Sequence, residues 1–100
     1  MITANIDKTL NIAINAESMD INNADIIMKE MKKEALSNAS KDIVVDLGNV
    51  RFVDSSAIAI LVKFVQSLVG SRRKISFVNA SESVLYSVNV LKLTKFLNFK

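Results

Sequence analysis

The sequence predicts an α/β fold, a mixed β-sheet with helices packed on it, in the order β-β-α-β-α-β-α followed by a terminal strand or turn. Half of the 100 residues are hydrophobic, and none is proline. Apolar residues alternate near the start and then switch between helical spacing and short continuous runs. Strands that alternate with helices are typical of largely parallel sheets with crossover connections. We expect residues 1–100 to form a single domain, because this length usually supports its own core.

The first part of the chain predicts a hairpin and an amphipathic helix. Apolar residues alternate over 2–6 and again over 10–14, which predicts two strands joined by a tight turn and adds an antiparallel part to the sheet. After residue 22 the apolar positions recur at helical spacing, at Ala24, Ile27, Met28, Met31 and Ala35. Asp25 and Lys29 lie four residues apart with the acid first, so we expect a weak pair. The polar segment 37–40 ends this helix.

The middle of the chain predicts a strand and a long helix. Residues 42–47 form an apolar run broken only by Asp46, which is typical of a central strand covered on both faces. We expect the carboxylate of Asp46 to lie at the strand end and to accept hydrogen bonds from backbone donors. Residues 57–69 are numerous enough for a helix, and Gly70 follows as a natural terminator.

The last part of the chain predicts one more strand and one more helix. Residues 74–78 are typical of a buried strand. Ser81 is a good capping residue for a helix whose apolar positions are Val84, Leu85, Val88 and Leu91. Residues 93–99 form a short apolar tail, which predicts either a last strand or a helical turn.

The composition excludes most kinds of catalytic and metal centre. The chain contains no cysteine and no histidine, so disulfides, thiolate catalysis, the Ser-His-Asp arrangement and the commonest metal ligand are all absent. The early acids, Asp7, Glu17 and Asp20, are spread over different elements. The two glycines, Gly48 and Gly70, form no phosphate-cradling loop. We therefore expect no enzyme, no metal and no cofactor.

Charge and hydropathy predict a cytoplasmic protein. The basic residues are scattered except for the segment 71–74, and the net charge is only +3. A solvated turn is the simplest interpretation of that segment, with contact to nucleic acid or anionic lipid as the alternative. No interleaved aromatic residues support single-strand binding. The start of the chain lacks an export signal, and the longest apolar region is too short to span a membrane. We expect neither nucleic-acid binding nor membrane insertion.

The segment Asp54-Ser55-Ser56 lies between an apolar strand and a helix, and all three residues are good N-cap residues. One of them is expected to cap the helix, but three in a row exceed what capping needs. Unpaired N–H groups at a helix start carry partial positive charge and favour a nearby phosphate. The segment therefore predicts a phosphorylation switch and not a reaction centre.

Three segments resemble the STAS domain family, which occurs in bacterial anti-sigma factor antagonists and in related transport proteins. Residues 42–47 followed by 50–58 resemble the family signature, a hydrophobic strand, a short loop and Asp-Ser-Ser/Thr-Gly-Leu. Ser18-Met19-Asp20 is similar to the Gly-x-Leu-Asp segment before the first family helix, and residues 91–96 resemble the closing segment. Together they cover almost the whole chain in the family's order, which implies a STAS-like fold.

The resemblance implies a phosphorylation-switched binding module, an anti-sigma factor antagonist that is not a catalyst. The phosphorylated serine of family antagonists corresponds to Ser55, with Ser56 as the alternative. Unmodified, the protein would bind a cognate anti-sigma factor serine kinase, and a phosphatase would restore this form. The expected partner-binding residues are Asp20, Asp54, Ser55, Ser56, Ala59, Ile60 and Lys63.

A second function is compatible with the same resemblance. The protein would be a cytoplasmic STAS accessory subunit of an ABC-type lipid or solute transporter, whose ATPase it would contact permanently. The serines would then act structurally. The family commonly has glycine where this chain has Ala57, and we expect the Ala57 methyl group to alter the surface that a partner meets.

Overall fold

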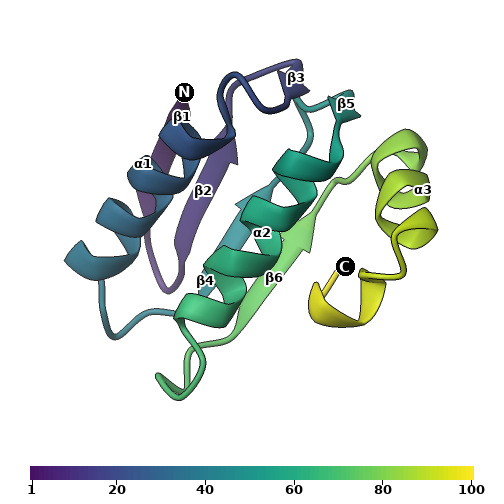
Figure 1. The fold of residues 1–100 in the computed structure, drawn as a ribbon. Coiled ribbons are helices and arrows are strands. Elements are labelled where there is room, and N and C mark those ends of the chain that lie inside the picture. The colour runs from purple at the N-terminus through teal and green to yellow at the C-terminus, as the bar shows by residue number, and fades with distance from the viewer.

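The computed structural model, which describes residues 1–100, contains a four-stranded sheet with two neighbouring helices packed on it (Figure 1). The strands are β1 (Ile2–Ile6), β2 (Leu10–Ile14), β4 (Ile43–Asp46) and β6 (Ile75–Val78), in the spatial order β1-β2-β4-β6. β1 and β2 are antiparallel, whereas β4 is parallel to both β2 and β6. The helices are α1 (Ala24–Ser37), α2 (Ser55–Ser67) and α3 (Glu82–Val90). This arrangement confirms the predicted mixed α/β fold.

A second, two-stranded sheet is not predicted by the sequence. Its strands β3 (Ser18–Met19) and β5 (Phe52–Val53) pair in parallel, with Ser18 opposite Phe52 and Met19 opposite Val53. Strands of two residues are too short to show an alternating pattern. This small sheet nevertheless determines where the loops before α1 and α2 meet.

The helices α1 and α2 lie over the same face of the main sheet (Figure 1). Along β4, Ile43 and Val45 belong to the hydrophobic core and are fully buried, whereas Val44 and Asp46 on the opposite face are only half-buried. The prediction that residues 42–47 are covered on both faces is therefore wrong, because both crossover helices lie on one side. β6 is the last of the four strands in the spatial order, and Phe77 is its only fully buried residue.

The carboxylate of Asp46 accepts hydrogen bonds from the loop that follows β4 and from the residue that follows β6. Its Oδ1 accepts hydrogen bonds from the backbone N–H of Gly48, at 2.8 Å, and from the side-chain amide of Asn79, at 3.1 Å. The first bond confirms the expected backbone donor. The second joins the ends of β4 and β6.

The helix α2 begins two residues earlier than predicted. Asp54 acts as its N-cap, so Ser55 is the first helical residue and the helix ends at Ser67. Gly70 follows with a φ of 89°, a backbone conformation that glycine adopts without a steric penalty. No helix of the structure is both long and apolar enough to cross a membrane.

The C-terminal tail combines the two predicted alternatives. A 3-10 turn over Thr94–Phe96 is followed by a parallel bridge between Phe99 and Phe77 of β6. The N–H of Phe77 donates to the carbonyl of Asn98 at 2.8 Å, and the two phenylalanine rings lie 5.7 Å apart between centroids. The tail therefore extends the main sheet beyond β6.

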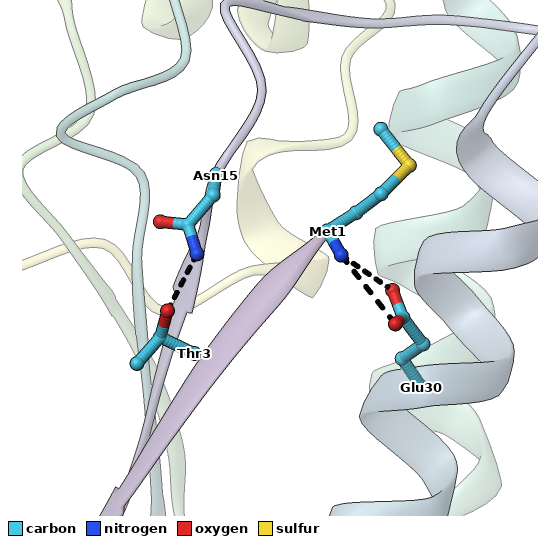
Figure 2. Close-up of polar contacts among 4 residues, drawn as sticks. All are labelled: Met1, Thr3, Asn15 and Glu30. Atoms are coloured by element: carbon cyan, nitrogen blue, oxygen red, sulfur yellow. Dashed lines mark hydrogen bonds and ion pairs between the residues drawn. The ribbon is translucent and has the colours of Figure 1, made fainter.

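The one ion pair in the structure joins Met1, the residue before β1, to α1, as Figure 2 shows. The amino group of Met1 lies 3.2 Å from Oε1 of Glu30. The predicted pair between Asp25 and Lys29 does not form, which agrees with the small free energy that an exposed pair of this kind gains.

Arg73 fixes the loop after α2 to the end of α1. Its guanidinium donates three hydrogen bonds to backbone carbonyls: those of Ala35 at 2.8 Å, Asn38 at 2.8 Å and Lys41 at 2.6 Å. The last carbonyls of a helix lack partners within the helix, and the last turn of α1 contains no basic residue of its own. Arg73 supplies the missing donors from a distant part of the chain.

Replacing Arg73 tests this contact. We expect Arg73→Ala to lower the free energy of unfolding in urea by about 2 kcal/mol, because three carbonyls lose a charged donor. Arg73→Lys should recover only part of this loss, since an ammonium group cannot reproduce the planar fork. Lys74→Ala, an exposed neighbouring change, is the control and should cost under about 0.5 kcal/mol. Equal losses for Arg73→Ala and Lys74→Ala would contradict the proposed role.

Candidate functional site

Asp54 joins the start of α2 to the loop that precedes α1. Its backbone is extended, with φ −102° and ψ −179°. One carboxylate oxygen, Oδ1, accepts a hydrogen bond from the N–H of Ala57 at 2.9 Å and so caps the helix. The other, Oδ2, accepts from the N–H of Ile21 at 3.0 Å. A single side chain therefore holds together two segments that are far apart in the sequence.

The small sheet holds the same two segments together through the backbone. Besides the pairing of β3 with β5, the N–H of Arg51 donates to the carbonyl of Glu17 at 2.7 Å. The N–H of Asp54 donates to the carbonyl of Met19 at 3.3 Å. Residues 17–21 and 51–54 therefore form one hydrogen-bonded unit that precedes the starts of α1 and α2.

Asp20 shapes the loop that presents Ile21. Its Oδ2 accepts from the hydroxyl of Ser18 at 3.0 Å, and its Oδ1 accepts from the N–H of Asn22 at 2.9 Å. The backbone N–H of Asp20 donates to the side chain of Asn23 at 2.9 Å. The structure thus brings the loop of Asp20 next to Asp54, two of the expected partner-binding residues, but the carboxylate of Asp20 is bound within its own loop.

An open hollow lies between the start of α1 and the exposed side of α2. Its volume is about 250 Å³, and its lining consists of Ile21, Ala24, Asp25, Ser56, Ala59, Ile60 and Lys63. The four lining residues from α2 are spaced so that they share one side of the helix. All four are among the predicted partner-binding residues. Within this group Ala59 and Lys63 are exposed, whereas Ile60 is only 8% exposed.

The sequence does not reveal the opposite wall of the hollow. Ile21, Ala24 and Asp25 line it from the start of α1 and the loop before it. The side chain of Ile21 is 72% exposed, and an isolated isoleucine within a polar segment was the one available signal. Its proximity to α2 depends on how the two helices pack, which no local pattern specifies.

Ser55 is the exposed first residue of α2, next to the capping Asp54. N–H groups in the first turn of a helix have no partner within the helix and carry partial positive charge. The hollow is lined by the neighbouring Ser56, and its lining contains one acid, Asp25, and one base, Lys63. A phosphate on Ser55 would add about −1.5 to −2 charges at neutral pH to a nearly balanced surface.

Ala57 does not lie on the surface that a partner can reach. It is 0% exposed and belongs to the hydrophobic core. The expectation that its methyl group alters the partner surface is therefore wrong. Ala57, Ile58 and Leu61 face inward from α2, whereas Ser55 and Ala59 face outward.

The side chains of the site provide a modifiable hydroxyl but no cluster of metal ligands. Nowhere in the chain do three or more acidic side chains gather in a group that could hold a metal ion. Both carboxylate oxygens of Asp54 already accept backbone hydrogen bonds. The arrangement offers a surface for contact and a serine that another protein can reach.

The model of the STAS domain matches residues 2–100, almost the whole chain. The chain belongs to the STAS domain family. No curated protein matches its sequence. The family match confirms the resemblance carried by the Asp54-Ser55-Ser56 segment and its flanking strand.

Four solved structures illustrate the range of proteins that contain this STAS fold. An anti-sigma-factor antagonist (STAS) domain protein from Planctomyces limnophilus has a TM-score of 0.86 and 14% identity, covering 98% of this chain and 87% of its own. The unphosphorylated form of the anti-sigma factor antagonist SpoIIAA has a TM-score of 0.78 and 15% identity. This match covers 100% of this chain and 88% of SpoIIAA. Bacillus SpoIIAA in its phosphorylated form also matches.

The fourth structure is the murine anion transporter Slc26a9, with a TM-score of 0.77 and 17% identity. The match covers 94% of this chain but only 16% of the transporter. At such identities these likenesses show the fold alone. The STAS fold thus occurs both in small antagonists and as one part of a transporter.

Removing the carboxylate of Asp54 tests whether it joins the two segments. We expect Asp54→Ala to lower the free energy of unfolding by about 2 kcal/mol, because the cap of α2 and the bond to Ile21 are both lost. Hydrogen exchange of the Ile21 amide should accelerate.

The matched control is Ser81→Ala, because Ser81 caps α3 through the N–H of Val84 at 3.1 Å. This variant should lower the free energy of unfolding by about 1 kcal/mol and leave the hydrogen exchange of the Ile21 amide unchanged. An Ile21 amide that exchanges equally slowly in Asp54→Ala would show that Asp54 does not hold the loop.

Proposed function

We propose that the protein is a phosphorylation-switched binding module of the anti-sigma factor antagonist type. In the unmodified form it binds an anti-sigma factor serine kinase through the hollow and the adjoining Ile21 loop. The kinase phosphorylates Ser55, the complex dissociates, and a phosphatase restores the binding form. The protein itself is the substrate in both reactions and catalyses neither.

One observation carries this proposal: the exposed Ser55, the first residue of α2, directly precedes Ser56, which lines an open, partly apolar hollow. Ile21 supplies an apolar side chain at the rim, and Ala59 leaves room on α2 for a partner side chain. Asp54 and Asp20 act by positioning, since their carboxylates hold the two loops in place. A partner therefore meets a preformed surface.

The effect of phosphate follows from the charges at this surface. Asp54 stands next to Ser55, and the hollow itself contains one acid and one base. A phosphoserine makes the rim strongly negative and is bulkier than a hydroxyl. A partner surface that fits the unmodified serine, or that pairs its own charges with Asp25 and Asp54, no longer matches the added charge and bulk. Its binding is therefore weakened. The structures of SpoIIAA in unphosphorylated and phosphorylated forms support a switch of this kind in the same fold.

Phosphate mapping tests the modification site. Incubation with ATP and a candidate anti-sigma factor kinase from the same genome should place one phosphate on Ser55, identified by mass spectrometry. Ser55→Ala should abolish the modification, whereas Ser56→Ala, the matched control, should retain it. Phosphate on Ser56 alone would assign the switch to the neighbouring residue, and label on neither serine would refute the switch.

Affinity measurements test the hollow. We expect Ala59→Arg to weaken kinase binding at least about tenfold, equivalent to about 1.4 kcal/mol, because the long side chain fills the hollow. Ser55→Asp should weaken binding to a similar degree through its added negative charge. Gln66→Arg adds the same side chain at an exposed position of α2 outside the hollow. Equal affinities of Ala59→Arg and Gln66→Arg would exclude the hollow as the contact surface.

The transporter match supports a second candidate, a STAS accessory subunit bound to the ATPase of an ABC-type transporter. In that case the hollow makes a permanent contact and Ser55 is a helix-start residue without regulation. Genes for a permease and an ATPase next to this one would favour this function, whereas a gene for a histidine-kinase-like ATPase would favour the switch. Binding of the transporter ATPase that is unaffected by Ser55→Asp would establish the second candidate.

A further inference from the structure

The end of the molecule opposite the hollow carries an excess of positive charge. Three segments meet there: the β1–β2 turn, the end of α1 with its following loop, and the loop between α2 and β6 (Figure 1). We call residues 6–9, 32–42 and 68–74 the basic end. It contains seven basic and three acidic residues, whereas the rest of the chain contains six basic and seven acidic ones. The net charge of +3 therefore arises entirely at this end.

Hydrogen bonds fix the three segments of the basic end to one another. The ammonium group of Lys41 donates to the carbonyl of Asp7 at 2.6 Å, and Arg73 donates to three carbonyls at the end of α1 and in the loop after it. The N–H of Lys74 donates to Oδ1 of Asp42 at 2.9 Å. The carboxylate of Asp7 accepts from the N–H of Thr9 at 3.0 Å, and this bond is the main reason that the pKa of Asp7 is lowered. The segments that carry the basic residues are thus held in fixed positions relative to one another.

The two most exposed large hydrophobic side chains of the chain lie at the same end. Leu36 is 77% exposed and Val69 is 80% exposed. Leu36 lines a groove of about 220 Å³ together with Lys32 of α1 and Leu68, the residue next to Val69. The exposed bases Lys33 and Arg72 lie nearby in the sequence of the same two segments. Exposed apolar and basic side chains therefore occur together in these two segments.

We propose that the basic end docks on an anionic lipid surface. Leu36 and Val69 enter the interface, and Lys32, Lys33 and Arg72 pair with lipid phosphates. Exposed apolar side chains among bases are typical of proteins that bind at a membrane interface, and each base near an anionic surface strengthens binding about fivefold. The basic end contains no aromatic residue, so it lacks the stacking platform that single-stranded nucleic acids require.

This orientation keeps the proposed switch accessible. The helices α1 and α2 both run from the end of the molecule near β3 and β5 toward the basic end (Figure 1). The hollow is lined by the start of α1 and by residues 56–63 of α2. When the basic end lies on a membrane, Ser55 and the hollow point away from it. Membrane docking and partner binding then use separate surfaces, and the docking proposal does not depend on the switch.

Co-sedimentation with vesicles tests the proposal. The intact protein should bind vesicles of phosphatidylcholine and phosphatidylglycerol several-fold more than vesicles of phosphatidylcholine alone, and added salt should release it. The double variant Leu36→Ser/Val69→Ser should lose binding by at least about fivefold, and so should Lys33→Glu/Arg72→Glu. All four positions are exposed, and unchanged thermal unfolding would confirm that both variants are folded.

The matched control is Tyr86→Ser/Val90→Ser, which removes exposed apolar side chains of α3 that are 71% and 58% exposed. It should bind like the intact protein. Equal binding to both kinds of vesicle, or equal losses in the control and in Leu36→Ser/Val69→Ser, would overturn the proposal. Labelled single-stranded RNA that binds while anionic vesicles do not would overturn it as well and identify the basic end as a nucleic-acid surface.

Discussion

The arrangement of the candidate site depends on one carboxylate that serves two segments. Asp54 satisfies the N–H of Ala57 at the start of α2 and the N–H of Ile21 in the loop before α1. The N–H groups at a helix start lack partners within the helix, and here one side chain accepts from the start of α2 and from the loop that forms the opposite wall of the hollow. Because the β3–β5 pairing holds the same segments, Ile21 and Ser55 keep a fixed relation without any ligand.

The direction of the two large helices gives the molecule two unlike ends. α1 and α2 cover one face of the sheet and share a direction, so their positive N-terminal ends lie near Ser55 and their negative C-terminal ends lie near Arg73. A phosphate is favoured at the first end and cations at the second. The distribution of basic residues follows this polarity, since Arg73 itself binds the last carbonyls of α1.

Most of the fold could be predicted because its elements have strong patterns. The β1–β2 hairpin, the three helices and the two parallel strands all follow from apolar spacing. The β3–β5 sheet could not be predicted, because two residues show no period and its pairing is decided by tertiary structure. The core position of Ala57 was also misjudged, since the sequence motif places it beside the serines while the turn of the helix carries it inward. The α2 side of the hollow follows from helical spacing, whereas the Ile21 side depends on helix packing.

An NMR titration would test the central claim, that the hollow beside Ser55 is the partner surface, most directly. The isotope-labelled protein would be titrated with the candidate kinase without nucleotide, and the backbone amide shifts mapped along the chain. Shifts centred on Ile21, Asp25, Ala59 and Lys63, and absent in the Ser55-phosphorylated protein, are the expected result. Shifts confined to α3 or to the basic end, or unchanged by phosphate, would contradict the account.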